Sequence, residues 1–571
     1  MRILILLAPL LAATATPAPF PVKEVLAKTE TIRLAPDLSG LTVAEQSAVK
    51  DLLEAGQIFQ DLYETSKHHQ ALEARAALAK SGDKDLRSLY WLNNGPIGTT
   101  LTNTRLPIVP AVDPEVPGKN VYPIGITRAE VDAFLAAHPA ERGSILGERT
   151  VVRRATKANL DRDLATLAKH PAISVLQPGM QQKLRALKAD SKILYAVPYS
   201  VAYAGSLMKA YGLLNRAAGK LEASDDELAG YLRNRARDLI ANDYESGDAS
   251  WVTGRFARLN AQIGSYETYD DALYGTKAFH AFSLLSTNEK ATNELRGALG
   301  GLQEIENVLP YEHHKRVRDD ISVGVYNVIA DFGQARGTNT ATILPNDALY
   351  SARYGRTILL RENIMRHPLL FAADLRIWRS ALADAHANDL TDEGNFQRTL
   401  WHEIGHYLGV DRDKDGRSLD VALQDQADAL EEMKSDLVSL FALHRMNHPG
   451  LRTIQASGIR RTLQNVKPRK DQPYQTMQLA QFNYFLENGL LAADPQTARL
   501  TVDYDRYRDV VTSLLREVLT LQRGGDRDAA ARFFERYGAW IPELHEKLAT
   551  HIREAQGNSR FRIVRYEALG Q

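Results

Sequence analysis

The chain has 571 residues with 70 basic and 70 acidic side chains, 44% hydrophobic and 25% charged residues, and no cysteine. This length exceeds one ordinary core and predicts two or more lobes, while the balanced charge gives no electrostatic basis for binding nucleic acid or an anionic membrane. Without cysteine, disulfides, thiolate metal sites and cysteine nucleophiles are excluded.

The N-terminus has the pattern of a secretory signal. Arg2 supplies a positive start, residues 3–13 are apolar but too few to span a bilayer, and Ala13-Thr14-Ala15 offers a small-x-small cleavage site. We therefore expect a signal peptide over residues 1–18, a periplasmic or secreted bacterial protein, and no membrane segment after its removal. A buried N-terminal helix is the alternative interpretation.

The next part of the chain mixes helical and extended patterns. Helical spacing over 41–78 is followed by a proline-rich stretch, 87–123, which predicts a long ordered loop. Thr127 with Glu130, and Ser224 with Glu227, have the spacing of capping boxes that begin helices. Segments rich in β-branched residues predict strands over 321–330, 338–344 and 357–360. From 369 to 555 the pattern is almost wholly helical.

The most informative stretch is TLWHEIGHYLG, residues 399–409. His402 and His406 are four residues apart, so they share one face of a helix and can bind one metal ion. Glu403 lies beside them, where a carboxylate can take a proton from water as a general base. Asn395 is a possible N-cap for this helix.

A third metal ligand is expected on the following acidic helix, which contains EEMKSD. Glu431 and Glu432 are adjacent and therefore about 100° apart on a helix, so only one should face the histidines. Glu432 as ligand, with Asp436 four residues on as the carboxylate that orients a ligand histidine, completes a catalytic zinc site with one zinc ion per chain. Glu431 is left for a second supporting hydrogen bond or for solvent. The alternative is that this acidic pattern is only a solvated helix face.

Between the two helices, residues 411–416 read DRDKDG and imitate the start of an EF-hand loop. The twelfth position is Ala422, so the bidentate glutamate of such a loop is missing. A solvated turn is the preferred interpretation, and calcium binding is left open.

These motifs resemble the dipeptidyl peptidase III family of zinc metallopeptidases. The similarity is greatest to the bacterial H-E-x-x-H type and to the peptidase-like half of plant Nudix fusion proteins, although no Nudix box is visible. Further segments resemble the same family: YWLNNGPIG (90–98), AVPY (196–199), IGSYETYDDALYGTKAFHAF (263–282), ILPND (343–347) and QFNYFLENG (481–489).

The resemblance implies an α+β, mostly helical protein with two lobes flanking a wide cleft. One lobe would be helical and carry zinc, and the other would be mixed with a small β-barrel core. The corresponding division is a signal peptide (1–18), a mixed lobe (19–288), part of the helical lobe (289–326), a β-rich return to the mixed lobe (327–372), the helical zinc lobe (373–555) and a C-terminal tail (556–571).

The resemblance also implies release of dipeptides from the free N-terminus of oligopeptides. Glu267, Tyr269 and Asn346 match the family's substrate contacts, and Tyr269 could also donate a hydrogen bond during catalysis. Ile343 occupies the position where the family has an amide side chain, which weakens the expectation that cleavage follows the second residue. The family's substrate-binding histidine has no counterpart in residues 474–481. Without the resemblance, the YETYDD segment would read as a turn with core tyrosines.

We expect metal-assisted peptide hydrolysis, with Glu403 as the general base. Three alternatives stay open: a zinc endopeptidase or other aminopeptidase on the same site, a peptide-binding protein without turnover, and hydrolysis of a non-peptide amide or ester. The sequence does not predict the oligomeric state.

Overall fold

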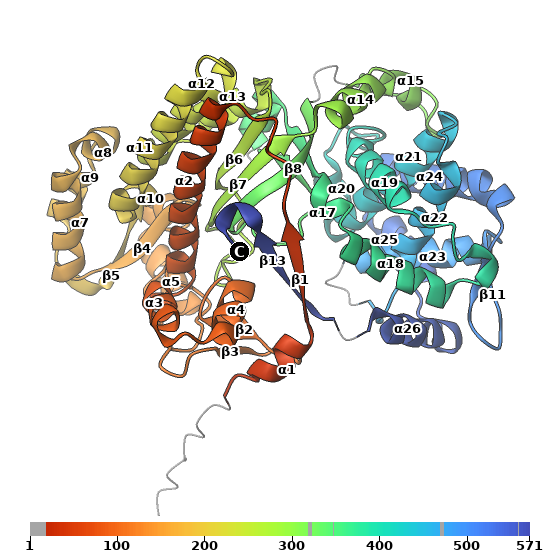
Figure 1. Ribbon diagram of the computed structural model, residues 1–571, viewed down its shortest axis with the longest axis horizontal. Coiled ribbons are helices and arrows are strands. Elements are labelled where there is room, and N and C mark those ends of the chain that lie inside the picture. Colours follow the sequence, from red (N-terminus) through yellow and green to blue (C-terminus); the bar gives the residue numbers. More distant parts are fainter. Residues whose placement is uncertain (1–18, 318–321, 346–347, 469–472, 558) are drawn as a thin grey trace, which may run out of the picture.

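The chain folds into two lobes in a computed structural model that describes residues 19–571 except 318–321, 346–347, 469–472 and 558 (Figure 1). The expected signal peptide, residues 1–18, lies outside the described residues. The protein is mostly helical with one larger sheet, so the predicted α+β, two-lobed fold class is confirmed. Among the described residues, no helix combines the length and hydropathy needed to cross a membrane.

The first lobe is built on a five-stranded sheet, which curls into an open half-barrel where a small barrel was expected. The strand order is β6-β7-β8-β10-β9, with bounds Leu259–Ser265, His280–Thr287, Ser322–Gly333, Thr357–Arg361 and Ala341–Leu344. Within the described part of this sheet, β10 and β8 pair in parallel and the other neighbours pair antiparallel. Strand β8 is buried along almost its whole length, as its near-continuous apolar sequence requires.

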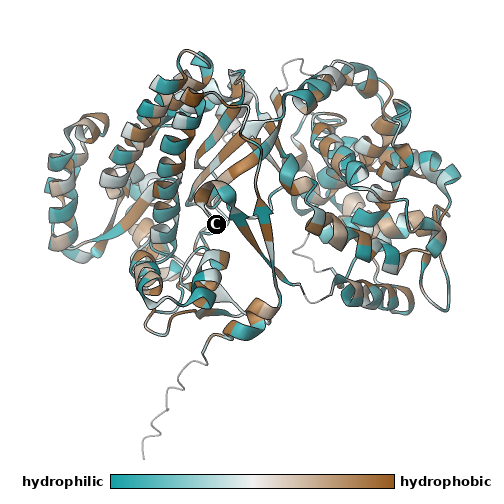
Figure 2. Cartoon of the chain, viewed as in Figure 1, coloured by the Kyte–Doolittle hydropathy of each residue, from teal (hydrophilic) through white to brown (hydrophobic). Residues whose placement is uncertain are grey.

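Long helices cover this sheet. Helix α2 (Val43–Lys67) contacts both β7 and β8 and packs in turn on α11 (Ala204–Leu221), which packs on α12 (Asp226–Ala241). Figure 2 shows apolar residues concentrated on the strands and hydrophilic residues on the outer helices. The predicted loop over 87–123 is interrupted by the end of α4 (Lys84–Asn93) and by a short hairpin, because Ile97–Thr99 (β2) pairs with Arg105–Pro107 (β3).

The second lobe is a bundle of helices around its own apolar core. Helix α19 packs on α21 and α22, and α21 packs on α24. The main helices are α18 (Pro368–Ala381), α19 (Asp392–Gly405), α21 (Ala427–Arg445), α22 (Leu451–Thr462), α23 (Pro473–Glu487), α24 (Tyr507–Gly524) and α26 (Pro542–Gln556).

The C-terminal segment returns to the first lobe. Strand β13 (Phe561–Tyr566) pairs in parallel with β1 (Thr29–Leu34), and Val564 and Tyr566 enter the core under the five-stranded sheet. The residues after α26 therefore join the lobes, and β13 and β1 lie between them in Figure 1.

Two capping predictions have different outcomes. The Thr127 side chain accepts from the Glu130 amide at the start of α5 (Arg128–Ala137), as expected. The cap of α12 is Asp225 and not Ser224, because the Asp225 carboxylate accepts from the amide of Leu228. A carboxylate one position on offers a stronger acceptor to the positive end of the helix.

Helices α19 and α21 approach each other most closely at Gly405. A Cβ atom there would lie 2.7 Å from the carbonyl oxygen and 3.0 Å from the Cα of Ser435. Both atoms belong to backbone, which cannot move aside as a side chain can. Gly405 therefore sets the spacing between the two helices.

We expect Gly405→Ala to lower the free energy of unfolding by about 1–3 kcal/mol, because the added methyl forces the helices apart. Gly230→Ala on α12 is the matched control: its Cβ meets nothing within 4 Å, so the variant should gain about 0.5–1 kcal/mol. Denaturant unfolding measures both. Equal stabilities would contradict the close contact at Gly405.

Candidate metal centre

Helix α19 presents the H-E-x-x-H residues to a cavity that residues of both lobes line. It begins at Asp392, and its N-cap is Thr391, whose hydroxyl accepts from the amide of Gly394; the expected Asn395 cap is wrong. His406 is the C-cap residue and keeps right-handed helical backbone angles. The four-residue spacing therefore holds both histidines on one side of the helix.

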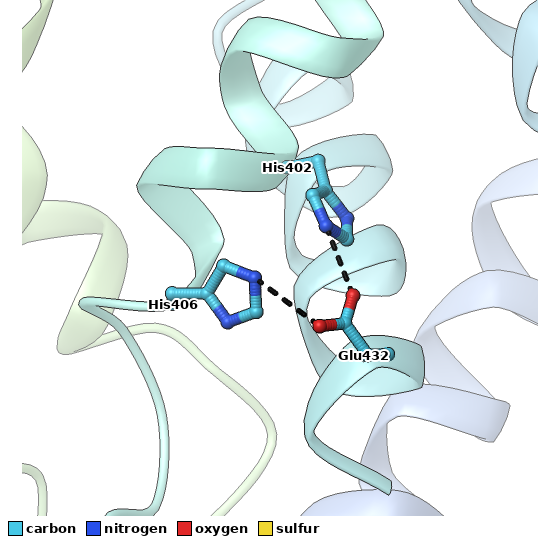
Figure 3. A group of neighbouring side chains, drawn as sticks. All are labelled: His402, His406 and Glu432. Carbon is cyan, nitrogen blue, oxygen red and sulfur yellow. Dashed lines mark ion pairs between the residues drawn. The ribbon is translucent and has the colours of Figure 1, made fainter. Parts of the chain in front are cut away.

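His402, His406 and Glu432 come together across α19 and α21, and Figure 3 shows their side chains pointing toward one another. One ligand atom from each lies within 4.8 Å of the others. The Glu432 carboxylate is 3.2 Å from His402 Nε2 and 3.9 Å from His406 Nε2. Glu432 Oε2 is buried and accepts no hydrogen bond from the described residues. Two imidazoles and one carboxylate fit a zinc ion with an open coordination position.

Both histidines are oriented by carboxylates of α21. Asp436 Oδ1 lies 2.7 Å from His402 Nδ1, and Glu431 Oε1 lies 3.0 Å from His406 Nδ1. Each Nδ1 is thereby occupied, which leaves Nε2 directed toward Glu432. The sequence allowed Glu431 either to make a supporting hydrogen bond or to face solvent, and in the structure it makes the hydrogen bond, with His406. Glu432 faces the Nε2 atoms of both histidines, whereas Glu431 contacts His406 at Nδ1.

Arginines neutralise Asp436. Arg461 Nε lies 2.6 Å from Asp436 Oδ2, and Arg398 Nη1 lies 3.3 Å from Oδ1. Burial would raise the pKa of Asp436, but Arg461 and His402 hold it far below its usual range. For His402 burial lowers the pKa and the Asp436 carboxylate outweighs that effect, so the pKa is raised. Asp436 therefore stays ionised behind the His402 ring.

Lys434 connects the helix end to the second supporting carboxylate. Its side chain is buried, with its ammonium 2.7 Å from Glu431 Oε1. It also donates to the carbonyl oxygens of Gly405 and Leu408, at 2.9 and 2.8 Å. A cation at these last carbonyls is favourable, because they form the negative end of the α19 dipole. Lys434 holds Glu431 ionised: burial raises the Glu431 pKa, but Lys434 and His406 lower it to about 2.

The metal centre opens into a cavity of about 780 Å³. Glu403 is half-buried and lines it together with His402, His406 and Glu432. Polar side chains form much of the remaining wall, and these are Thr338, Thr340, Asp374, Asn395, Arg398, Thr399, Ser457, Arg460, Arg461, Gln464, Asn465, Tyr474, Gln475, Gln478, Gln556 and Arg562.

The predicted substrate contacts of the first lobe are not part of this wall. Glu267 and Tyr269 do not line the cavity, and the Tyr269 side chain is 68% exposed. Asn346 lies outside the described residues. Ile343, which departs from the family motif, does line the cavity from strand β9.

Sequence reasoning missed Tyr474. Its hydroxyl donates to Glu432 Oε1 at 3.0 Å from the first turn of α23. Burial, followed by the Glu432 charge, raises the pKa of Tyr474 above its ordinary value, so the hydroxyl remains a donor at neutral pH. Tyr474 is 42 residues from Glu432 in sequence, and no local spacing signals such a contact.

The EF-hand-like run is organised as a turn around Asp413. The buried Asp413 carboxylate accepts from the amides of Asp415 and Arg417 and from the Arg417 guanidinium. These donors occupy the Asp413 carboxylate, which an EF-hand loop would need as a calcium ligand.

No protein-family model matches the chain. Nudix hydrolase 3 of Arabidopsis thaliana is 28% identical over 440 residues, which are 74% of this chain and 54% of that protein. The chain thus spans about half the length of the curated relative it matches.

Two solved structures match nearly all of the chain. Dipeptidyl peptidase III from Caldithrix abyssi aligns with a TM-score of 0.80 and 25% identity, covering 96% of this chain and 99% of that one. Dipeptidyl peptidase III from Corallococcus sp. strain EGB aligns with a TM-score of 0.72 and 25% identity, covering 96% and 97%. Over almost its whole length this chain therefore resembles dipeptidyl peptidase III in fold as well as in motifs, which confirms the predicted resemblance.

Proposed function

We propose that the protein is a zinc-dependent exopeptidase that releases dipeptides from the free N-terminus of oligopeptides. The observation that carries this proposal is the convergence of His402, His406 and Glu432, with Glu403 in the same cavity. The likeness to two dipeptidyl peptidase III structures supports a peptidase. The resemblance to dipeptidyl peptidase III also supports zinc as the metal and a dipeptide as the product.

Each residue of the centre has a distinct task in hydrolysis. His402, His406 and Glu432 would hold zinc, which when bound polarises the scissile carbonyl and makes water a better nucleophile. Glu403 takes a proton from the attacking water and delivers it to the leaving amine. Asp436 and Glu431 keep both Nδ1–H groups occupied, so Nε2 stays the free ligand atom.

We assign recognition of the substrate amine to the first lobe. A peptide N-terminus is a cation, which the Glu267 carboxylate can pair with. Tyr269 is exposed, and its hydroxyl can donate a hydrogen bond to the peptide. Neither residue lines the cavity of the metal centre, so this assignment requires the lobes to close over the substrate. Asn346 completes the proposed set of substrate contacts.

The N-terminal signal leads us to propose a periplasmic or secreted location, where short peptides are available as substrates. The oligopeptide is the only partner that the proposal requires.

Glu403→Ala should retain bound zinc while the rate of peptide hydrolysis falls about 100- to 10,000-fold, because the general base is lost and the ligands are not. Zinc content by elemental analysis and turnover of an unblocked oligopeptide measure the two effects. Glu24→Ala, on the first helix α1 (Val22–Ala27), is a control for loss of an exposed glutamate. A Glu403→Ala variant that cleaves at the normal rate would show that Glu403 is not the base.

Glu432→Ala should lose zinc, because the site is left with two ligands. Glu431→Gln keeps the three ligands but weakens the acceptor behind His406, so zinc affinity should fall by about 10- to 100-fold. Competition with a chelator gives both dissociation constants. Chelator treatment of the wild-type protein should abolish hydrolysis, and added zinc should restore it. Hydrolysis that persists without metal would exclude the proposed reaction.

An oligopeptide with a free N-terminus should be cleaved after its second residue, and its N-acetylated form should not be cleaved, because acetylation removes the cationic amine. Mass spectrometry identifies the products of both. Cleavage of both forms at internal bonds would instead favour the endopeptidase alternative. Binding of the free peptide without any product would favour the peptide-binding alternative.

A further inference from the structure

The cavity that holds the metal centre carries more cationic than anionic side chains. Four arginines line it, against three carboxylates; the arginines are Arg398, Arg460, Arg461 and Arg562, and the carboxylates are Asp374, Glu403 and Glu432. Glu403 and Glu432 belong to the metal centre and its chemistry. Outside the three metal ligands and Glu403, the four arginines have two carboxylates nearby: Asp374, which lines the cavity, and Asp436, which lies behind His402.

The ion pairs of the arginines show where this excess lies. Arg398 and Arg461 share one carboxylate, Asp436, which also contacts His402. Arg460 Nη2 lies 2.6 Å from Asp374 Oδ1, and its Nε is buried without a hydrogen-bond partner among the described residues. A buried unpaired N–H is costly and marks a place where an acceptor fits.

Arg562 approaches the cavity from the other lobe. It lies in β13, is exposed, and makes no ion pair with any residue that the structure describes. Several amide side chains line the same cavity, among them Gln464, Asn465 and Gln556, and Asn465 donates to Gln556 at 3.2 Å. Guanidinium and amide donors together are the groups that bind a carboxylate.

We infer that these groups bind the free C-terminal carboxylate of the peptide whose scissile bond lies at the metal centre. A cavity of about 780 Å³ is the size of a small-molecule site and suits a short peptide, so the chain end can lie within it. This inference rests on the proposed peptidase function and narrows its substrates to short peptides with an unblocked C-terminus. Arg562 and Arg460 are its principal donors.

The test uses one short peptide of neutral side chains in three forms: the free acid, the C-terminal amide, and an amide with Glu as the last residue. Calorimetric titration into the zinc-loaded Glu403→Ala protein measures binding without turnover, and kcat/KM is measured on the wild type. We expect the free acid to bind about 10- to 100-fold more tightly than either amide, because charge-assisted hydrogen bonds are lost with its carboxylate.

Variants assign the effect to the arginines. Arg562→Gln, in the same background, should remove most of the preference for the free acid. Arg560→Gln is the matched control: Arg560 donates to Asn103, does not line the cavity, and should leave the preference unchanged. Arg460→Gln should lower the preference as well.

Equal binding of the free acid and the amide by the zinc-loaded Glu403→Ala protein would overturn the inference, as would a preference for the free acid that survives when Arg562→Gln is added. If the Glu-terminated amide binds as tightly as the free acid, the site recognises a side-chain carboxylate, and the assignment to the C-terminal carboxylate is wrong. A protein that binds the free acid preferentially but cleaves no peptide would retain this inference while refuting the proposed peptidase. The two failures are therefore distinguishable.

Discussion

The metal centre depends on one helix, α21, which supplies the third ligand and the two carboxylates that orient the histidines of α19. Glu431, Glu432 and Asp436 lie within six positions of one another, yet each meets a different atom of His402 or His406. This is possible because Gly405 lets the two backbones approach within van der Waals distance. A wider separation would take all three carboxylates out of reach together.

The carboxylates around the two histidines are balanced by cations of the second lobe that are buried or partly buried. Asp436 is matched by Arg398 and Arg461, and Glu431 by Lys434. Breaking one such pair would strand a charge at a cost of about 3–5 kcal/mol, so the network resists rearrangement. The histidine rings are consequently held by protein groups alone. A metal ion entering this site gains three ligands without paying to order them.

The two histidines and the acidic helix could be predicted because their signals are local: a four-residue spacing fixes a face of a helix whatever surrounds it. The contacts of Arg461, Lys434 and Tyr474 could not be predicted. A charged or aromatic residue on a helix gives the same sequence pattern whether it faces solvent or a partner on another helix. The shift of the α19 cap from Asn395 to Thr391 has a similar origin, since several nearby residues could cap and packing selects among them. Three strands of the half-barrel, β8, β10 and β9, were predicted with approximate ends, whereas β6 and β7 were not predicted.

The two parts of the cavity differ in how they depend on the arrangement of the lobes. The metal ligands come from two helices of one bundle, so they move as a unit. Arg562 and Ile343 reach the same cavity from β13 and β9, which belong to the sheet lobe. A change in the angle between the lobes therefore alters the distance from Arg562 to Arg460 while it leaves the His402–Glu432 geometry intact. If the proposed peptidase function holds, closure of the lobes would set the length and register of the bound peptide, while the geometry of the candidate metal ligands would not depend on it.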